Sequence, residues 1–86
     1  MSEILVTYDI ENDATREGVS GYLESFPIWH HMQKSVYIIN ADVKYKEIYD
    51  SIVPNLSKDD YLLVVDVTEA AGEQNGFIES SEDYKN

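Results

Sequence analysis

The amino-acid sequence predicts one α+β domain in which four strands form an antiparallel sheet and two helices cover one of its faces. Two nearly continuous apolar runs, at residues 4–10 and 61–67, are typical of strands buried in the middle of a domain. Two segments with apolar residues at helical spacing lie between these runs, together with a pair of shorter β-rich runs. The 86 residues leave room for a single domain.

The first helix is predicted directly after the first strand. A polar turn ends in Asp13, which is a suitable N-cap because its carboxylate accepts hydrogen bonds from free N–H groups. Val19, Leu23 and Phe26 then recur at three- and four-residue spacing and form one apolar stripe. Pro27 ends the helix because it lacks the N–H that a helix interior needs.

The next two strands are predicted at residues 28–32 and 36–40. Both runs are rich in apolar, β-branched and aromatic residues, and only the polar residues 33–35 separate them. This pattern indicates two antiparallel strands joined by a tight connection.

A second helix with Asp42 as its N-cap follows, and it ends at Pro54 before the last strand. The order is therefore strand, helix, strand, strand, helix, strand. Two right-handed crossovers around a central hairpin give the ferredoxin-like βαββαβ arrangement, a four-stranded antiparallel sheet with both helices on one face.

The domain is predicted to span residues 1–68, and an acidic C-terminal tail to span residues 69–86. The tail has little to bury, so it is expected either to be mobile or to add a short strand. Its one apolar pair, Phe77 and Ile78, is the expected place for that strand or for docking on a partner subunit.

Charge is the strongest compositional signal. Seventeen acidic residues against six basic residues give a formal net charge of −11, which disfavours nucleic acid as a partner. The absence of cysteine excludes disulfides and thiolate metal sites. No secretory signal is visible and no apolar run approaches the ~20 residues of a membrane span, so the sequence predicts a cytoplasmic protein.

Two short motifs resemble a known family. The first strand and its exit, Leu5-Val6-Thr7-Tyr8-Asp9-Ile10, resemble the opening of the small CRISPR-associated endoribonuclease family, and Gln33-Lys34-Ser35-Val36-Tyr37 is similar to its second recurring stretch. Virulence-associated protein D and related toxin-like proteins are similar in the same places. The resemblance covers residues 3–67 and implies a ferredoxin-like dimer that helps to integrate new spacers. It also implies that Asp9 holds a divalent metal, magnesium or manganese, at the dimer centre.

The candidate catalytic residues are Asp9, His30 and Ser35. Asp9 ends a buried strand, where it either binds a metal ion or caps the following turn. His30 and its neighbour His31 point to opposite faces of a strand, so only one of them can join a given site. That histidine either acts as a general acid or base near Ser35 or is satisfied by hydrogen bonds at the sheet edge.

Aromatic and apolar residues suggest a dimer interface. Seven tyrosines are many for so short a chain, and those on strands form an aromatic contact surface if they point outward. Trp29 either stacks on a base, fills an interface or packs in the core. The predicted dimer interface consists of Tyr8, Trp29, Tyr37, Phe77 and Ile78.

Two functions remain open at this point. The first is a dimeric interaction protein that imitates nucleic acid and binds a basic protein partner, as antitoxins and phage inhibitors do. The second is a metal-dependent endonuclease of the resembled family, with Asp9 at its centre. The net charge favours the first hypothesis. Its partner-binding residues are the acids Glu11, Asp13, Glu17, Glu24, Glu47 and Asp50.

Overall fold

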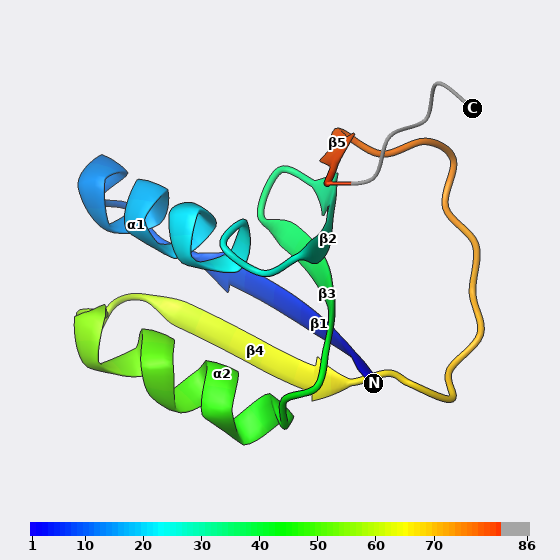
Figure 1. Cartoon of the computed structure of the whole chain (residues 1–86). Coiled ribbons are helices and arrows are strands. Elements are labelled where there is room, and N and C mark those ends of the chain that lie inside the picture. Colours follow the sequence, from blue (N-terminus) through cyan, green and yellow to red (C-terminus); the bar gives the residue numbers. More distant parts are fainter. Residues whose placement is uncertain (82–86) are drawn as a thin grey trace.

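The structure is a computed structural model that describes residues 1–81, and in it two α-helices lie on one face of a five-stranded antiparallel sheet (Figure 1). The predicted fold class and order of elements are confirmed, with a fifth strand added. Predicted strand ends differ from the observed ones by one or two residues. The elements are β1 (Ser2–Asp9), α1 (Asp13–Leu23), β2 (Ile28–Gln33), β3 (Val36–Ala41), α2 (Tyr45–Ile52), a 3₁₀ turn (Val53–Asn55), β4 (Tyr61–Asp66) and β5 (Glu79–Ser80).

The sheet order is β4-β1-β3-β2-β5, so the first strand lies at the centre between β3 and β4. Val6 of β1 stands opposite Tyr37 of β3 on one side and Val64 of β4 on the other. Because directly opposite residues share a face, this row places all three side chains on the same side of the sheet. That side is the one covered by the helices.

The core lies between the sheet and the two helices. From β1 the alternate residues Ile4 and Val6 are fully buried, and they pack with apolar residues that recur along each helix. Burial of these side chains from both layers is the main force that holds the helices on the sheet. The buried core consists of Ile4, Val6, Tyr8, Ile10, Val19, Leu23, Tyr37, Ile39, Ala41, Ile48 and Ile52.

Within residues 1–81, no helix covers the opposite face of the sheet. Leu5 and Thr7 of β1 lie on it, and β4 contributes Tyr61, Leu63 and Val65, which are 69%, 55% and 37% exposed. We call this surface the helix-free face. Figure 1 shows the long connection between β4 and β5 on this side of the molecule.

The first helix begins one residue earlier than its predicted cap implies. Asn12, not Asp13, is the N-cap, because its Oδ1 accepts a hydrogen bond from the backbone N–H of Thr15 at 2.9 Å. Asp13 is the first helical residue and its carboxylate accepts instead from the guanidinium of Arg16.

The second helix begins later than predicted. Its N-cap is Lys44, so Asp42 lies two residues before the cap and does not serve as one. The helix start is stabilised instead by Glu47, whose Oε1 accepts a hydrogen bond from the N–H of Lys44 at 3.0 Å.

Part of the predicted tail belongs to the sheet. Ser80 of β5 stands opposite His30 of β2, and Glu79 stands opposite His31. The added strand therefore follows Phe77 and Ile78 and does not contain them. The remainder of the predicted tail, residues 82–86, lies outside the described residues.

Within residues 1–81, no helix is long and apolar enough to cross a bilayer.

Candidate metal site at the end of the first strand

Asp9 is the last residue of β1, and it stands opposite Tyr61 of β4. Its neighbour Tyr8 faces the helices and is only 5% exposed. Because successive side chains of a strand point to opposite faces, Asp9 is directed to the helix-free face, where it is exposed. The structure thus presents this carboxylate to solvent at one end of the sheet.

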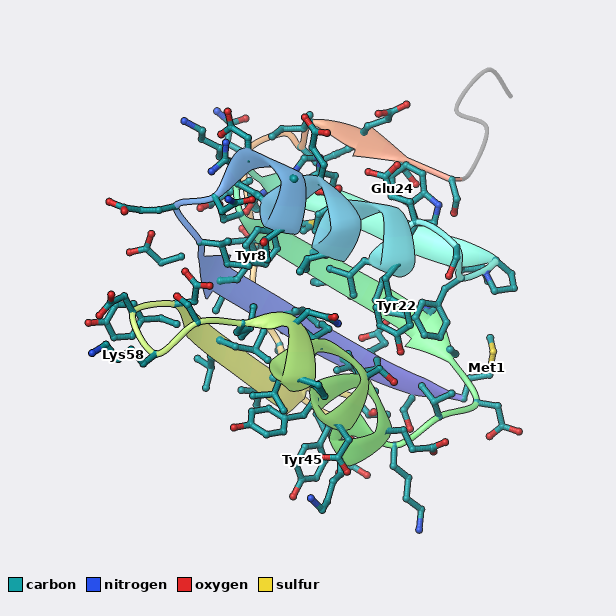
Figure 2. The ribbon with its side chains drawn as sticks, turned by 90° about the vertical axis from the view of Figure 1, so that its left-hand side faces the viewer. Met1, Tyr8, Tyr22, Glu24, Tyr45 and Lys58 are labelled. Carbon is teal, nitrogen blue, oxygen red and sulfur yellow. The ribbon has the colours of Figure 1, made fainter. Side chains whose placement is uncertain are left out.

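Tyr8 is anchored on the helix side of the sheet. Its hydroxyl lies 3.2 Å from Oγ of Ser20 on α1, and its backbone N–H donates to the carbonyl of Ser35 at 3.1 Å. Figure 2 shows Tyr8 on the side of β1 that faces α1. These contacts fix the strand immediately before Asp9.

Tyr37 extends the same hydroxyl network. Its side chain is fully buried, and its hydroxyl donates to the carboxylate of Glu24 and lies 3.4 Å from Oγ of Ser20. Figure 2 shows Glu24 near the C-terminal end of α1. Burial, and then the hydrogen bond to Glu24, raise the pKa of the Tyr37 phenol far above its ordinary value, so the phenol stays protonated. Glu24, predicted to bind a partner, is thus used inside the subunit.

Of the other two predicted catalytic residues, Ser35 lies near Asp9 and His30 does not. The bond between Tyr8 N and Ser35 O places Ser35 beside the end of β1. His30 belongs to a row across the sheet with Ile38 of β3 and Leu5 of β1. Asp9 is four residues further along β1 and two strands away from His30, a separation on the order of 15 Å. His30 instead contacts Ser80, whose Oγ lies 3.0 Å from its Nδ1.

The residue types at the end of β1 fit a hard cation. Magnesium prefers carboxylate oxygens, keeps several waters, and is held in many sites by only one or two carboxylates. Among residues 1–81, no group of three or more histidine, aspartate or glutamate side chains is arranged to hold a metal ion. Asp9 is the carboxylate that ends β1 on the helix-free face, and two subunits related by a two-fold axis through this face would offer two such carboxylates.

The five other predicted partner-binding acids are all exposed, and three of them make local contacts. Asp13 pairs with Arg16, Glu47 caps α2, and Oδ1 of Asp50 lies 3.4 Å from Nζ of Lys46. Such exposed pairs contribute little to stability. The remaining two are Glu11 and Glu17.

The predicted interface residues occupy two environments. Tyr8 and Tyr37 belong to the core of the subunit, and Trp29 is half-buried, with its ring 6.2 Å from that of Tyr37. Phe77 and Ile78 are 45% and 57% exposed.

Sequence reasoning missed the role of Ser20 and Glu24 as partners of the two buried tyrosines. Ser20 lies on α1 and Glu24 is the C-cap residue four positions later, so both side chains lie on one side of the helix. They also neighbour the predicted core residues Val19 and Leu23, which is a signal that polar groups reach the sheet there.

The antiparallel sheet and the βαββαβ order place this protein in the ferredoxin-like α+β class. An exposed aspartate ends its first strand. The sequence model of the family described as CRISPR associated protein Cas2 matches residues 1–74. The chain therefore belongs to the CRISPR-associated Cas2 family.

A solved structure agrees with this fold. The crystal structure of a hypothetical protein TT1823 from Thermus thermophilus is similar, with a TM-score of 0.71 and 20% sequence identity. The similarity covers 92% of this chain and 96% of that chain, and at this identity it concerns the fold alone. None of the curated proteins matches the chain.

The family match corrects the function favoured by charge. The hypothesis of an acidic interaction protein that imitates nucleic acid is wrong, because Cas2 proteins are adaptation proteins and typically metal-dependent nucleases. Net charge misled because it reports the average field of the surface, whereas binding and catalysis depend on the groups at one site.

Proposed function

We propose that this protein is a metal-dependent endonuclease that acts as a homodimer, with Asp9 of each subunit at the centre. The observation that carries the proposal is the exposed carboxylate of Asp9 at the end of β1 in a chain of the Cas2 family. RNA and DNA are both candidate substrates, since each contains the phosphodiester that this chemistry cleaves.

The donor chemistry at Asp9 suits magnesium or manganese. When bound, such an ion polarises a phosphodiester and lowers the pKa of a bound water. The chain itself holds Asp9 in place. The preceding residue, Tyr8, contributes through its hydrogen bonds on the opposite face of β1. Of the other two predicted catalytic residues, Ser35 is nearer to Asp9 than His30 is within one subunit.

The proposed dimer forms through the helix-free face. That face carries exposed apolar side chains next to Asp9, above all Tyr61 and Leu63 of β4. Phe77 and Ile78 are the exposed members of the predicted interface, and they lie beside β2, at the other edge of the sheet from β4. Contact between two copies of this face brings both Asp9 carboxylates to one interface. A cytoplasmic location, expected from the sequence, is part of this proposal.

The test is a cleavage assay on single- and double-stranded RNA and DNA with Mg²⁺ or Mn²⁺. Asp9→Asn should lower the cleavage rate by about 10²-fold or more, because even a residue that only supports a metal ligand typically contributes 10- to 100-fold. Asp42→Asn is the matched control, since it removes an exposed carboxylate at the opposite end of the sheet.

Sedimentation of Asp9→Asn would confirm that it assembles as the wild type does. Equal cleavage by wild type and Asp9→Asn, or no cleavage of any substrate by wild type, would overturn the proposal.

A further inference from the structure

Arg16 is the one arginine of the chain, and its side chain turns back toward the end of β1. Its Nη1 donates to the backbone carbonyl of Ile10 at 2.8 Å and to that of Glu11 at 3.2 Å. Its Nη2 donates to the carboxylate of Asp13. The guanidinium therefore spans the turn that leads from Asp9 into α1.

The geometry of these contacts requires arginine. A guanidinium is planar and offers several N–H donors in a fixed fork, and hydrogen bonds from a charged donor are stronger than those between neutral groups. The side chain is 36% exposed, so water competes only in part for its donors. Lysine carries the same charge on a flexible stem and cannot reproduce the fork.

The chain is anchored on both sides of Asp9. Before it, Tyr8 is bonded to Ser35 and Ser20. After it, the carbonyl groups of Ile10 and Glu11 are bonded to Arg16. Asp9 itself remains exposed between these two fixed points.

We propose that Arg16 is a positioning residue for Asp9, because it clamps the backbone that follows this carboxylate. The inference rests on the proposed function. It departs from the usual expectation for an arginine in a nucleic-acid enzyme, which is direct contact with phosphate. Here the guanidinium already serves three acceptors within its own subunit.

Two substitutions separate a clamp from a phosphate contact. Arg16→Lys keeps the charge but loses the fork, whereas Arg16→Gln loses both. If Arg16 is a clamp, the two variants should behave alike. Each should bind Mn²⁺ about 10- to 100-fold more weakly in the absence of nucleic acid. The Mg²⁺ concentration needed for half-maximal cleavage should rise by the same factor. Binding of a single-stranded RNA in EDTA should be unchanged. Lys46→Gln is the control, since it removes an exposed cation from α2.

Amide hydrogen exchange provides a readout that needs no metal. The N–H groups of Thr15 and Arg16 donate to Asn12 in the clamped turn, so their protection should fall in both variants, whereas that of Val67, bonded to Glu3 in the sheet, should not. Full protection in both variants would overturn the clamp, whatever the outcome for cleavage.

Near wild-type Mn²⁺ binding by Arg16→Lys, with RNA binding lost only in Arg16→Gln, would likewise overturn it and assign Arg16 to phosphate. A failure of the proposed function alone would look different: wild type would bind no Mn²⁺, while the exchange result would still hold.

Discussion

Tyr37 shows how one side chain joins two layers of this fold. Its ring is fully buried on the helix side of the sheet and stacks on the ring of His31 at a centroid distance of 4.2 Å. Its hydroxyl is hydrogen-bonded to Glu24 and lies near Ser20, both on the side of α1 that faces the sheet. Without these partners the buried hydroxyl would make no hydrogen bond, which is costly in a protein core. A tyrosine placed here needs that particular helix face above it.

The raised pKa of Tyr37 predicts a loss of stability in alkali. In the unfolded chain the phenol ionises near pH 10, whereas in the folded chain it stays protonated, so its stabilising effect is present below pH 10 and is lost as the pH rises further. The free energy of unfolding should fall by about 1.4 kcal/mol per pH unit above pH 10 from this group.

Urea denaturation at pH 7, 10 and 11 measures this effect. Tyr37→Phe should be less stable than wild type by about 1 kcal/mol at pH 7, because its hydrogen bonds are lost, and should lack this part of the alkaline decline. Tyr45→Phe, at a site on α2 that is 49% exposed and lies away from the helix-free face, should match wild type throughout. Parallel pH dependence in wild type and Tyr37→Phe would contradict the assignment.

At the scale of the element, the segment from Asp9 to Asp13, which joins β1 to α1, combines several functions in five residues. It ends a central strand, presents Asp9, and starts a helix through the cap at Asn12. Sequence patterns place the turn correctly but assign the cap to Asp13, since both residue types are good N-caps. In the structure the carboxylate of Asp13 accepts from Arg16, and Asn12 accepts from the N–H of Thr15.

Removing this cap should destabilise the protein. Asn12→Ala is expected to lower the free energy of unfolding by about 1 kcal/mol, because the N–H of Thr15 loses its partner. Asn12→Ser supplies another capping oxygen and should retain most of the stability. The measurement is urea denaturation at neutral pH, and equal stability of the alanine and serine variants would contradict the cap.

At the scale of the whole molecule, the two faces of the sheet differ in what covers them. The helices bury one face, while Leu63 and Tyr61 remain more than half exposed on the other. Exposed apolar side chains grouped on one face are typical of a protein interaction surface. The net charge of −11 describes the molecule as a whole and carries no information about this difference.

The helix-free face predicts how the proposed dimer can be broken. Leu63→Lys places a charge among apolar side chains and should raise the dimer dissociation constant by at least about tenfold. Sedimentation should then show a particle near the 9.9 kDa of one chain, where wild type shows about twice that mass. Tyr45→Lys is the control, because Tyr45 is 49% exposed on α2 and lies away from this face. An unchanged dimer in Leu63→Lys would place the interface elsewhere.

The sequence by itself determined the fold class, the order of the first four strands and the two α-helices, and Asp9 as the residue at the end of the first strand. These features depend on local patterns: continuous apolar runs for β1 and β4, and three- and four-residue spacing for the helices. The motif around Asp9 also indicated the family that the comparison shows.

Only the tertiary structure decided which side chains meet. Period-two alternation states that Tyr8 and Asp9 point to opposite faces, but the packing of α1 decides that Tyr8 is the buried one. Strand register separates His30 from Asp9 and pairs it with Ser80, some fifty residues later in the chain. The clamp by Arg16 depends on the angle at which α1 leaves β1, and neither spacing nor composition reports that angle.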